Sequence, residues 1–272
     1  MRPTKLSSHH RSKSTMKRRG KMKLGRVVAT ACATVALASG VAMATPATQV
    51  WIPSPDVKGF GDVHIDVDYY GRFSNKNNAG ANMYDIGVGV GISPFENLKL
   101  EIGADFLKQS IHDYDSHPFY FNAKLGTPED AFGIKGLPSF AVGIYNMGTY
   151  NDTSKGVYTR QNIAYGLAGK TLPVIGRISA GGYYGSESAL GKGANSGALV
   201  SWDRTMGEIS DKLWLAADYM SGNNANGAAS IGAAWAFSKN VSVLVGAVFF
   251  NPFQEEKPGG KPAFTTQLDL SF

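Results

Sequence analysis

From position 63 to the C-terminus, the chain is a succession of short runs in which apolar and polar residues alternate, separated by residues typical of turns. Alternation with a period of two predicts β-strands that have one face in an apolar medium and the other in water. About twelve runs can be counted, at residues 63–72, 84–92, 98–106, 119–125, 140–145, 162–170, 178–184, 196–203, 213–219, 229–237, 241–250 and 263–272. An even number of antiparallel strands, joined alternately by short turns and long loops, predicts an all-β fold, a transmembrane up-and-down barrel of about twelve strands.

The polar faces of these runs carry charged residues or glycines, which a solid protein core would not accommodate. The run at 98–106, for example, has Leu100 and Ile102 on one face and Glu101 on the other. We therefore expect the apolar faces to contact lipid and the polar faces to line a water-filled lumen. A soluble β-sandwich is the alternative, but it would not need a charged or glycine-rich face on nearly every strand.

The charged residues on the polar faces are the candidates for lining a pore. They are Asp66, Asp68, Arg72, Asp85, Lys99, Glu101, Asp105, Lys124, Arg160, Lys170, Arg177, Asp218 and Asp269. Charges of both signs along a closed wall are typical of water-filled pores, whose ion selectivity they set. The alternative is that they pair across the lumen and fill it, because twelve strands lie between filled eight-stranded and open sixteen-stranded barrels. On the run at 162–170, this assignment places Lys170 in the lumen and turns Ile163 and Tyr165 toward lipid.

The last run ends the chain on an aromatic residue. One face carries Phe264, Leu268, Leu270 and Phe272, with Thr266 among them, and the other carries Thr265, Gln267, Asp269 and Ser271. This ending resembles the closing strand of bacterial outer-membrane β-barrels. The resemblance implies that the four large apolar residues form a signal for the outer-membrane assembly machinery.

The formal net charge of +6 at first suggests a protein that binds anions. Of the 27 Lys and Arg residues, however, ten lie in residues 1–44, which contain no Asp or Glu, and this leaves 17 basic against 21 acidic residues in the remainder. The basic segment is followed by an apolar run and by Ala42-Met43-Ala44, the pattern of a cleaved secretory signal peptide. We therefore predict that residues 1–44 are removed after Ala44 and that the mature chain does not bind nucleic acid.

The only cysteine, Cys32, lies in this leader, so the exported fold cannot depend on disulfides. Residues 45–62 follow the leader. They include Trp51, Pro53 and Pro55 and are too rich in Pro and Gly for a helix or a long strand. We interpret them as a short periplasmic tail or a plug that precedes the barrel domain at residues 63–272.

Motifs for catalysis, cofactors or metals are few. Gly87-Val88-Gly89-Val90-Gly91 resembles a phosphate-binding loop, but its glycines alternate within a strand and no Lys-Ser or Lys-Thr follows, so we predict no cofactor. The residues His112, Asp113, Asp115 and His117 form a weak candidate set for zinc, because proximity within a loop does not fix tetrahedral geometry. We expect no metal site and no enzymatic activity, since no serine lies in a G-x-S-x-G context and few histidines could serve as a base.

Three stretches, at residues 50–54 (Val-Trp-Ile-Pro-Ser), 121–133 and 201–206 (Ser-Trp-Asp-Arg-Thr-Met), resemble a family of poorly characterised, porin-like outer-membrane β-barrel proteins of Gram-negative bacteria. The resemblance extends over the chain from about Thr45 and implies an outer-membrane location, with no catalytic residue to transfer. We predict a passive channel for small hydrophilic solutes, embedded in outer-membrane lipid. The alternatives are a structural or surface-interaction barrel that acts through its outer loops and, third, an outer-membrane lipid enzyme.

Overall fold

The computed structural model describes residues 48–272, so the predicted leader and its cleavage site lie outside the described residues. The strands are β1 (Val63–Arg72), β2 (Met83–Gly91), β3 (Lys99–Lys108), β4 (Phe119–Thr127), β5 (Ser139–Asp152), β6 (Val157–Leu172), β7 (Gly176–Tyr184), β8 (Ser196–Thr205), β9 (Leu213–Met220), β10 (Ala228–Ala236), β11 (Val241–Phe250) and β12 (Ala263–Ser271). Three short helical turns lie in connections of this part of the chain: α2 (His112–Asp115), η2 (Ala131–Gly133) and α3 (Glu187–Leu190).

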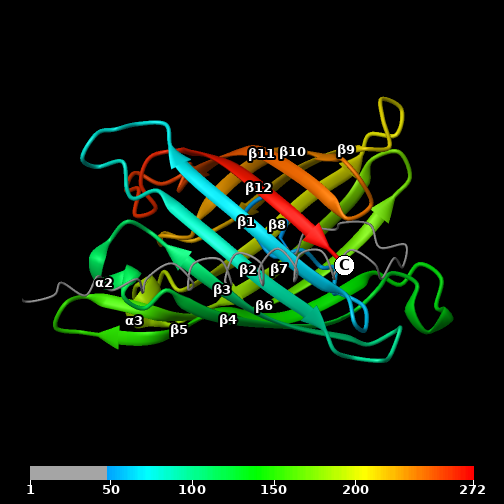
Figure 1. Ribbon diagram of the computed structural model, residues 1–272, viewed down its shortest axis with the longest axis horizontal. Coiled ribbons are helices and arrows are strands. Elements are labelled where there is room, and N and C mark those ends of the chain that lie inside the picture. Colours follow the sequence, from blue (N-terminus) through cyan, green and yellow to red (C-terminus); the bar gives the residue numbers. More distant parts are fainter. Residues whose placement is uncertain (1–47) are drawn as a thin grey trace, which may run out of the picture. The chain divides into compact units, whose positions relative to one another are not determined.

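Each strand pairs antiparallel with its neighbours in sequence, and β1 also pairs with β12, so the sheet closes on itself (Figure 1). The β1–β12 seam runs in register from His64 opposite Ser271 to Arg72 opposite Ala263. Closure leaves no strand with an unpaired edge. The predicted fold, a closed antiparallel barrel of about twelve strands, is confirmed, and each predicted run overlaps one strand.

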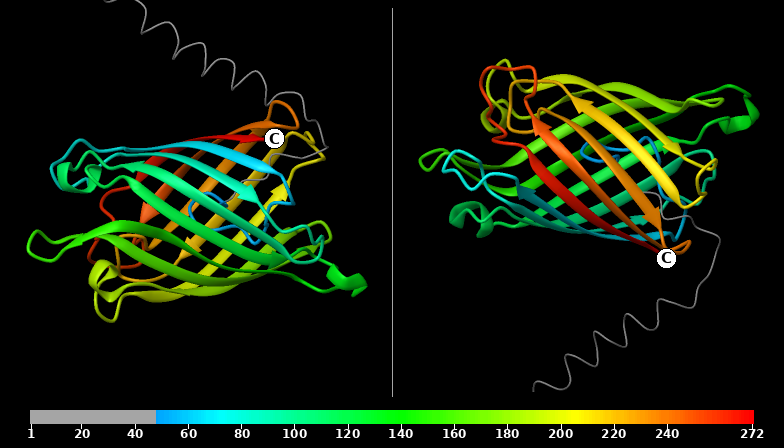
Figure 2. Two further views of the ribbon diagram at one scale, coloured as in Figure 1. Left: turned by 60° about the horizontal axis from the view of Figure 1, so that its bottom comes forward. Right: turned by 90° about the horizontal axis from the view of Figure 1, so that it is seen from above.

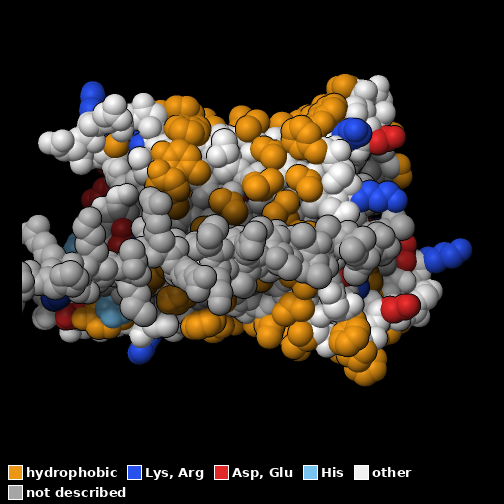
Figure 3. All heavy atoms as spheres, in the orientation of Figure 1, with side chains coloured by type: hydrophobic (Ala, Val, Ile, Leu, Met, Phe, Trp, Pro, Cys, Tyr) orange, Lys and Arg blue, Asp and Glu red, His pale blue; other side chains and the backbone are white. Residues whose placement is uncertain are grey.

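The outer wall of the barrel is apolar. Ile102 is 44%, Val142 56% and Ile231 57% exposed, although large aliphatic side chains are usually buried. Figure 3 shows hydrophobic side chains spread over the visible wall and charged side chains gathered toward its two ends. An apolar surface of this extent is a contact surface for a partner or for lipid.

Among residues 48–272, no helix combines the length and the apolar character that crossing a membrane would require.

The two ends of the barrel differ. We call the end at which β1 begins and β12 finishes the turn end. The opposite end, with long connections such as 73–82, 109–118 and 251–262, is the loop end. The β5–β6 hairpin departs from the prediction there, because β5 continues through residues 149–152, beyond the run predicted at residues 140–145. The Thr159 side chain explains part of this: its Oγ1 accepts the Tyr150 N–H (2.9 Å) and donates to the Tyr150 carbonyl (2.5 Å), which holds a polar sequence in strand conformation.

Strand β6 presents the opposite faces from those predicted. Ile163 is fully buried and Tyr165 nearly so, both on the inner face, whereas Lys170 pairs in register with Ile178 of the exposed outer wall. Arg160, an even number of residues from Lys170, shares that outer face and is exposed. The assignment of Arg160 and Lys170 to the lumen was therefore wrong, because it assumed that every strand turns its charges inward.

Both cations have partners that explain the outward position. Lys170 Nζ lies 2.9 Å from Glu129 and 3.4 Å from Asp130 in the β4–β5 connection at the turn end. Arg160 donates to the Thr149 carbonyl (3.0 Å) near the loop end. Charges at the ends of a membrane strand can face outward, because the cost of exposing them falls toward the interfaces.

Candidate functional site: the barrel lumen

Residues 48–62 form what we call the N-terminal segment. Its first part lies inside the barrel, where Figure 2 shows it in blue within the ring of strands, and Phe60 is exposed where the segment approaches β1. Thr48 and Pro53 form an isolated antiparallel β-bridge, and the Gln49 N–H donates to the Ile52 carbonyl (2.7 Å), so the chain reverses direction in a tight turn. The two prolines that follow prevent a helix from continuing. This tight turn therefore fills part of the lumen.

The carboxylate of Asp218, on β9, holds the backbone of this turn. Its Oδ2 accepts the N–H groups of Val50 (2.8 Å), Trp51 (2.8 Å) and Ile52 (3.4 Å), while its Oδ1 accepts the Ser230 hydroxyl. Successive backbone N–H groups that converge in this way form an anion-binding concavity, and hydrogen bonds to a charged acceptor are the stronger kind. Asp218 is buried, so the wall and the segment are joined by a water-shielded polar contact.

Two side chains of the turn anchor it in apolar surroundings. The Trp51 ring meets Tyr70 and Phe250 edge to face, each with a centroid separation of 5.3 Å, and its Nε1–H donates to the Asn226 carbonyl (2.8 Å). Ile52 is fully buried in a cluster whose wall residues include Ile163, Tyr165, Leu167, Leu199 and Met220. This contact explains why β6 turns apolar residues inward: they pack against the N-terminal segment and not against lipid.

An ionic contact holds the returning half of the segment. Arg177 on β7 lies 2.7 Å from Asp56 of the segment and 2.9 Å from Asp203 on β8. Burial alone would raise the pKa of Asp56, but the Arg177 guanidinium outweighs it and lowers that pKa. Lys124 Nζ donates to the Asp56 carbonyl (2.9 Å), and Gln49 donates to Asp203 (3.1 Å).

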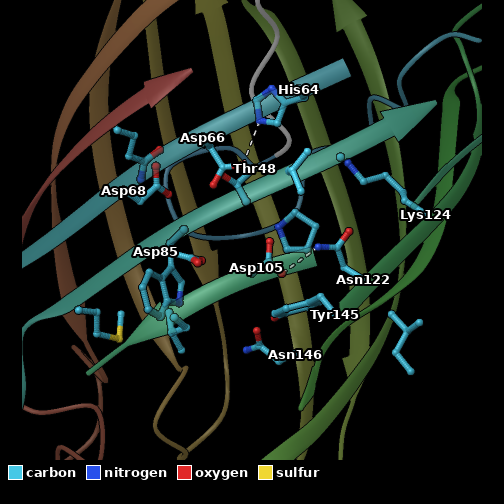
Figure 4. Close-up of a pocket in the computed structure, with 18 of the residues that line it drawn as sticks. Thr48, His64, Asp66, Asp68, Asp85, Asp105, Asn122, Lys124, Tyr145 and Asn146 are labelled. Atoms are coloured by element: carbon cyan, nitrogen blue, oxygen red, sulfur yellow. Dashed lines mark hydrogen bonds and ion pairs between the residues drawn. The ribbon is translucent and has the colours of Figure 1, made fainter. Parts of the chain in front are cut away.

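Beside the segment a cavity of about 210 Å³ remains (Figure 4). Seven of the predicted pore-lining residues border it: Asp66, Asp68, Asp85, Glu101, Asp105, Lys124 and Asp269. Thr48, Trp51 and Pro53 of the segment form its other side. The lumen is thus part filled and part open, an arrangement between the two alternatives that the strand number allowed.

The alternating glycines of β2 make room for the acidic wall. A Cβ atom on Gly87 would lie 2.5 Å from Asp66 Oδ1 and 2.9 Å from Asp105 Oδ1, and one on Gly89 would lie 3.2 Å from Glu101 Oε1. Contacts under 3 Å do not occur for real Cβ atoms, so any larger residue at position 87 would displace a carboxylate. The Gly-Val-Gly-Val-Gly motif therefore belongs to the wall of the cavity and not to a phosphate-binding loop.

Two further predicted pore-lining residues, Arg72 and Lys99, lie elsewhere on the inner wall. Arg72 lies at the loop end, where it donates to the carbonyls of Ala81 (2.9 Å) and Lys261 (2.6 Å) and covers the Phe250 ring. It therefore ties two long connections together. Lys99 is at the first position of β3, two residues before the inward-facing Glu101, near the turn end.

Sequence reasoning did not single out several residues that hold the segment. Gln267 donates to the Val50 carbonyl (2.8 Å), and Asp203 binds both Arg177 and Gln49. Both residues lie on polar faces of their strands, and this was the only signal available for them.

The weak candidate set for zinc is not brought together. His112 is 95% exposed, Asp113 lies 3.4 Å from Lys155, Asp115 accepts the Gln109 N–H (2.7 Å), and His117 stacks on the Tyr150 ring. Within residues 48–272, no three His, Cys, Asp or Glu side chains converge in a way that would hold a metal ion.

No protein-family model and no curated protein matches the chain. Among solved structures, it is similar to a KdgM porin at 8% identity and a TM-score of 0.44, covering 77% of this chain and 99% of that one. It is also similar to the outer membrane phospholipase A from Escherichia coli (11% identity, TM-score 0.43, covering 76% and 92%) and to the Acinetobacter baumannii outer membrane protein Omp33 (10%, 0.37, 78% and 97%). These outer-membrane proteins include both a porin and an enzyme, so the function has to be argued from the residues of this chain.

Proposed function

We propose that the protein is a porin-like channel of the bacterial outer membrane, through which small hydrophilic solutes diffuse passively. The observation that carries the proposal is the contrast between the two faces of one closed wall. The outer face exposes large apolar side chains, and the inner face surrounds a polar cavity of about 210 Å³. The apolar outer face suits contact with lipid, and the polar inner face suits contact with water, as in membrane-spanning barrels.

The predicted signal peptide supports the location, because it directs the chain out of the cytoplasm. In this proposal the turn end faces the periplasm and the loop end faces outward. Lipid is the partner of the outer wall, and the assembly machinery recognises the closing strand through Phe264, Leu268, Leu270 and Phe272. The exposed apolar face of β12, with Phe264 36% exposed, supports that role.

The N-terminal segment acts in this proposal as a plug that narrows the channel. It occupies the lumen beside the cavity and is held by Asp218, Arg177 and the Trp51 contacts. We therefore expect a small conductance from the intact protein and a larger one when the segment is released. The segment continues into β1 at Val63, but its docking contacts are hydrogen bonds, an ion pair and side-chain packing, so its release requires no break in a strand pair.

Planar-bilayer recording on the refolded protein tests the proposal. The intact chain should form steps of small, ohmic conductance, and a variant lacking residues 48–56 should form larger steps. Liposome swelling with sugars of increasing size should give a larger size limit for the truncated variant. Proper insertion is checked first by heat-dependent mobility in gels, because an unfolded sample also fails to conduct. Absence of conductance from both inserted proteins would refute the channel.

A further inference from the structure

The part of the cavity formed by β1, β2 and β3 carries a cluster of carboxyl groups. Asp68 lies directly opposite Asp85 in the β1–β2 register, and the carboxylates of Asp66 and Asp105 both extend over Gly87. Figure 4 shows these four carboxylates gathered around one space. Within residues 48–272, no ion pair joins any of the four to a lysine or arginine, although His64 lies 3.3 Å from Asp66.

Polar atoms around this space lack hydrogen-bond partners. His64 is 1% exposed and borders the cavity, yet neither of its ring nitrogens makes a hydrogen bond; its Nε2 faces Asp66 (3.3 Å) and Asp269 (3.8 Å). The Oδ1 atoms of Asp68 and Asp85 are likewise buried and without a partner. Buried polar atoms are normally hydrogen-bonded, and leaving them unpaired is costly. A ligand with several N–H donors would satisfy the two carboxylate oxygens.

The remaining wall of the cavity indicates what else the ligand carries. Trp51, Tyr70 and Tyr145 border the same space and offer aromatic faces, and Leu107, opposite Asp85 in the β2–β3 register, adds an aliphatic surface. Aromatic faces attract ammonium groups, and apolar side chains accommodate methylene groups. The volume of about 210 Å³ exceeds the roughly 150 Å³ of a cavity known to hold benzene. A metal ion does not suit the site, because no three ligand side chains converge within the described part of the chain.

We propose that this cavity binds small aliphatic amines, above all diamines, whose ammonium groups pair with the Asp66–Asp105 and Asp68–Asp85 carboxylates. This inference names the solute class of the proposed channel and rests on that function for its physiological meaning. The binding itself depends only on the cavity. The N-terminal segment contributes Trp51 and Pro53 to the site, so docking of the segment completes it.

Calorimetric titration of the refolded full chain in detergent tests the binding. The probes are 1,4-diaminobutane, the dianion butanedioate, which has the same chain length and the opposite charge, and neutral 1,4-butanediol. We expect heat of binding from the diamine alone, and Asp68→Asn with Asp85→Asn should weaken it by at least about tenfold, since charge-assisted hydrogen bonds are lost. Substituting Glu255→Gln and Glu256→Gln in the β11–β12 connection removes the same charge outside the cavity and should leave the affinity unchanged.

Two outcomes overturn the inference: butanedioate or butanediol binds as well as the diamine, or both double variants bind the diamine with equal affinity. The Asn variants remove carboxylates that lack ion pairs with lysine or arginine, so they are expected to fold, and heat-dependent gel mobility checks this. Bilayer recording separates this inference from the channel. Diamine binding without conductance refutes the channel and leaves the site in place, whereas conductance without diamine binding refutes the site alone.

Discussion

Removal of the Asp218 carboxylate should release the N-terminal segment from the wall. In Asp218→Ala, the N–H groups of Val50 and Trp51, each 2.8 Å from Oδ2, lose their acceptor, and the Ser230 hydroxyl loses another. The longer contact of Ile52 (3.4 Å) adds little. The substitution removes no lipid-facing side chain and no strand pair, so the barrel itself should still form.

The size of the effect follows from the two short hydrogen bonds. Each buried donor left without an acceptor costs about 1–3 kcal/mol, and water that enters the lumen recovers part of this. We therefore expect the docked segment to lose about 2–4 kcal/mol, which shifts the equilibrium between docked and released forms by roughly 30- to 1,000-fold. Ile52 and the Trp51 ring contacts still favour docking, so both forms should be populated.

Single-channel recording in planar bilayers measures this equilibrium as the fraction of time spent in a high-conductance state. Fluorescence of Trp51, in a variant that lacks the other tryptophans, reports the same release as a shift toward the emission of exposed indole. The matched control is Asp68→Ala, which removes an equal charge from the lumen wall but no hydrogen bond to the segment backbone. The reasoning is refuted if the two variants change conductance equally, or if Trp51 stays buried in Asp218→Ala.

Three further predictions concern the wall, the closing strand and pH. Ile102→Arg should destabilise the barrel in lipid by about 2–4 kcal/mol in denaturant titrations, while Glu101→Gln should mainly change the reversal potential; the opposite order would mean that β3 faces the other way. Deletion of Phe272 should lower the amount of folded protein in the outer membrane by cell fractionation, and an unchanged amount would count against an assembly signal. Burial alone would raise the pKa of Asp56, but in the docked segment Arg177 lowers that pKa below the ordinary value of 3.8. The ion pair therefore stabilises docking fully above pH 3.8, and this stabilisation is lost as the pH falls through the lower pKa of the docked form. Bilayer conductance should therefore rise in acid below about pH 3.8, and the rise should be smaller in Asp56→Asn.

The strands could be predicted from sequence because a single physical rule, alternation against two media, governs nearly all of them. Ile102 and Glu101 lie as the rule requires. The rule fails on β6, where the inner face meets the Ile52 side chain and not water, so an apolar face there is turned inward. A charge at a strand end is equally ambiguous: Lys170 faces outward because Glu129 lies beside it at the turn end.

The contacts of the N-terminal segment could not be predicted in the same way. Proline and glycine content left a tail and a plug equally open, and the Asp218 contact is made to backbone N–H groups, which leave no mark in the sequence. Its partners are also 166 to 168 residues away. The glycines at 87 and 89 did carry a signal, since small residues on an acidic face indicate crowded carboxylates, but only the structure identifies Asp66, Asp105 and Glu101 as the side chains concerned.

The position of the segment next to the seam also has a consequence for folding kinetics. Val50 is held by Gln267 of the last strand, a contact that spans 217 residues, and Lys58 reaches Ser271 of the same strand (3.5 Å). Contacts of such long range form late, because the loop between them has to close first. Full docking of Trp51 therefore waits for the arrival of β12, and burial of that indole during refolding marks the moment at which the barrel is complete.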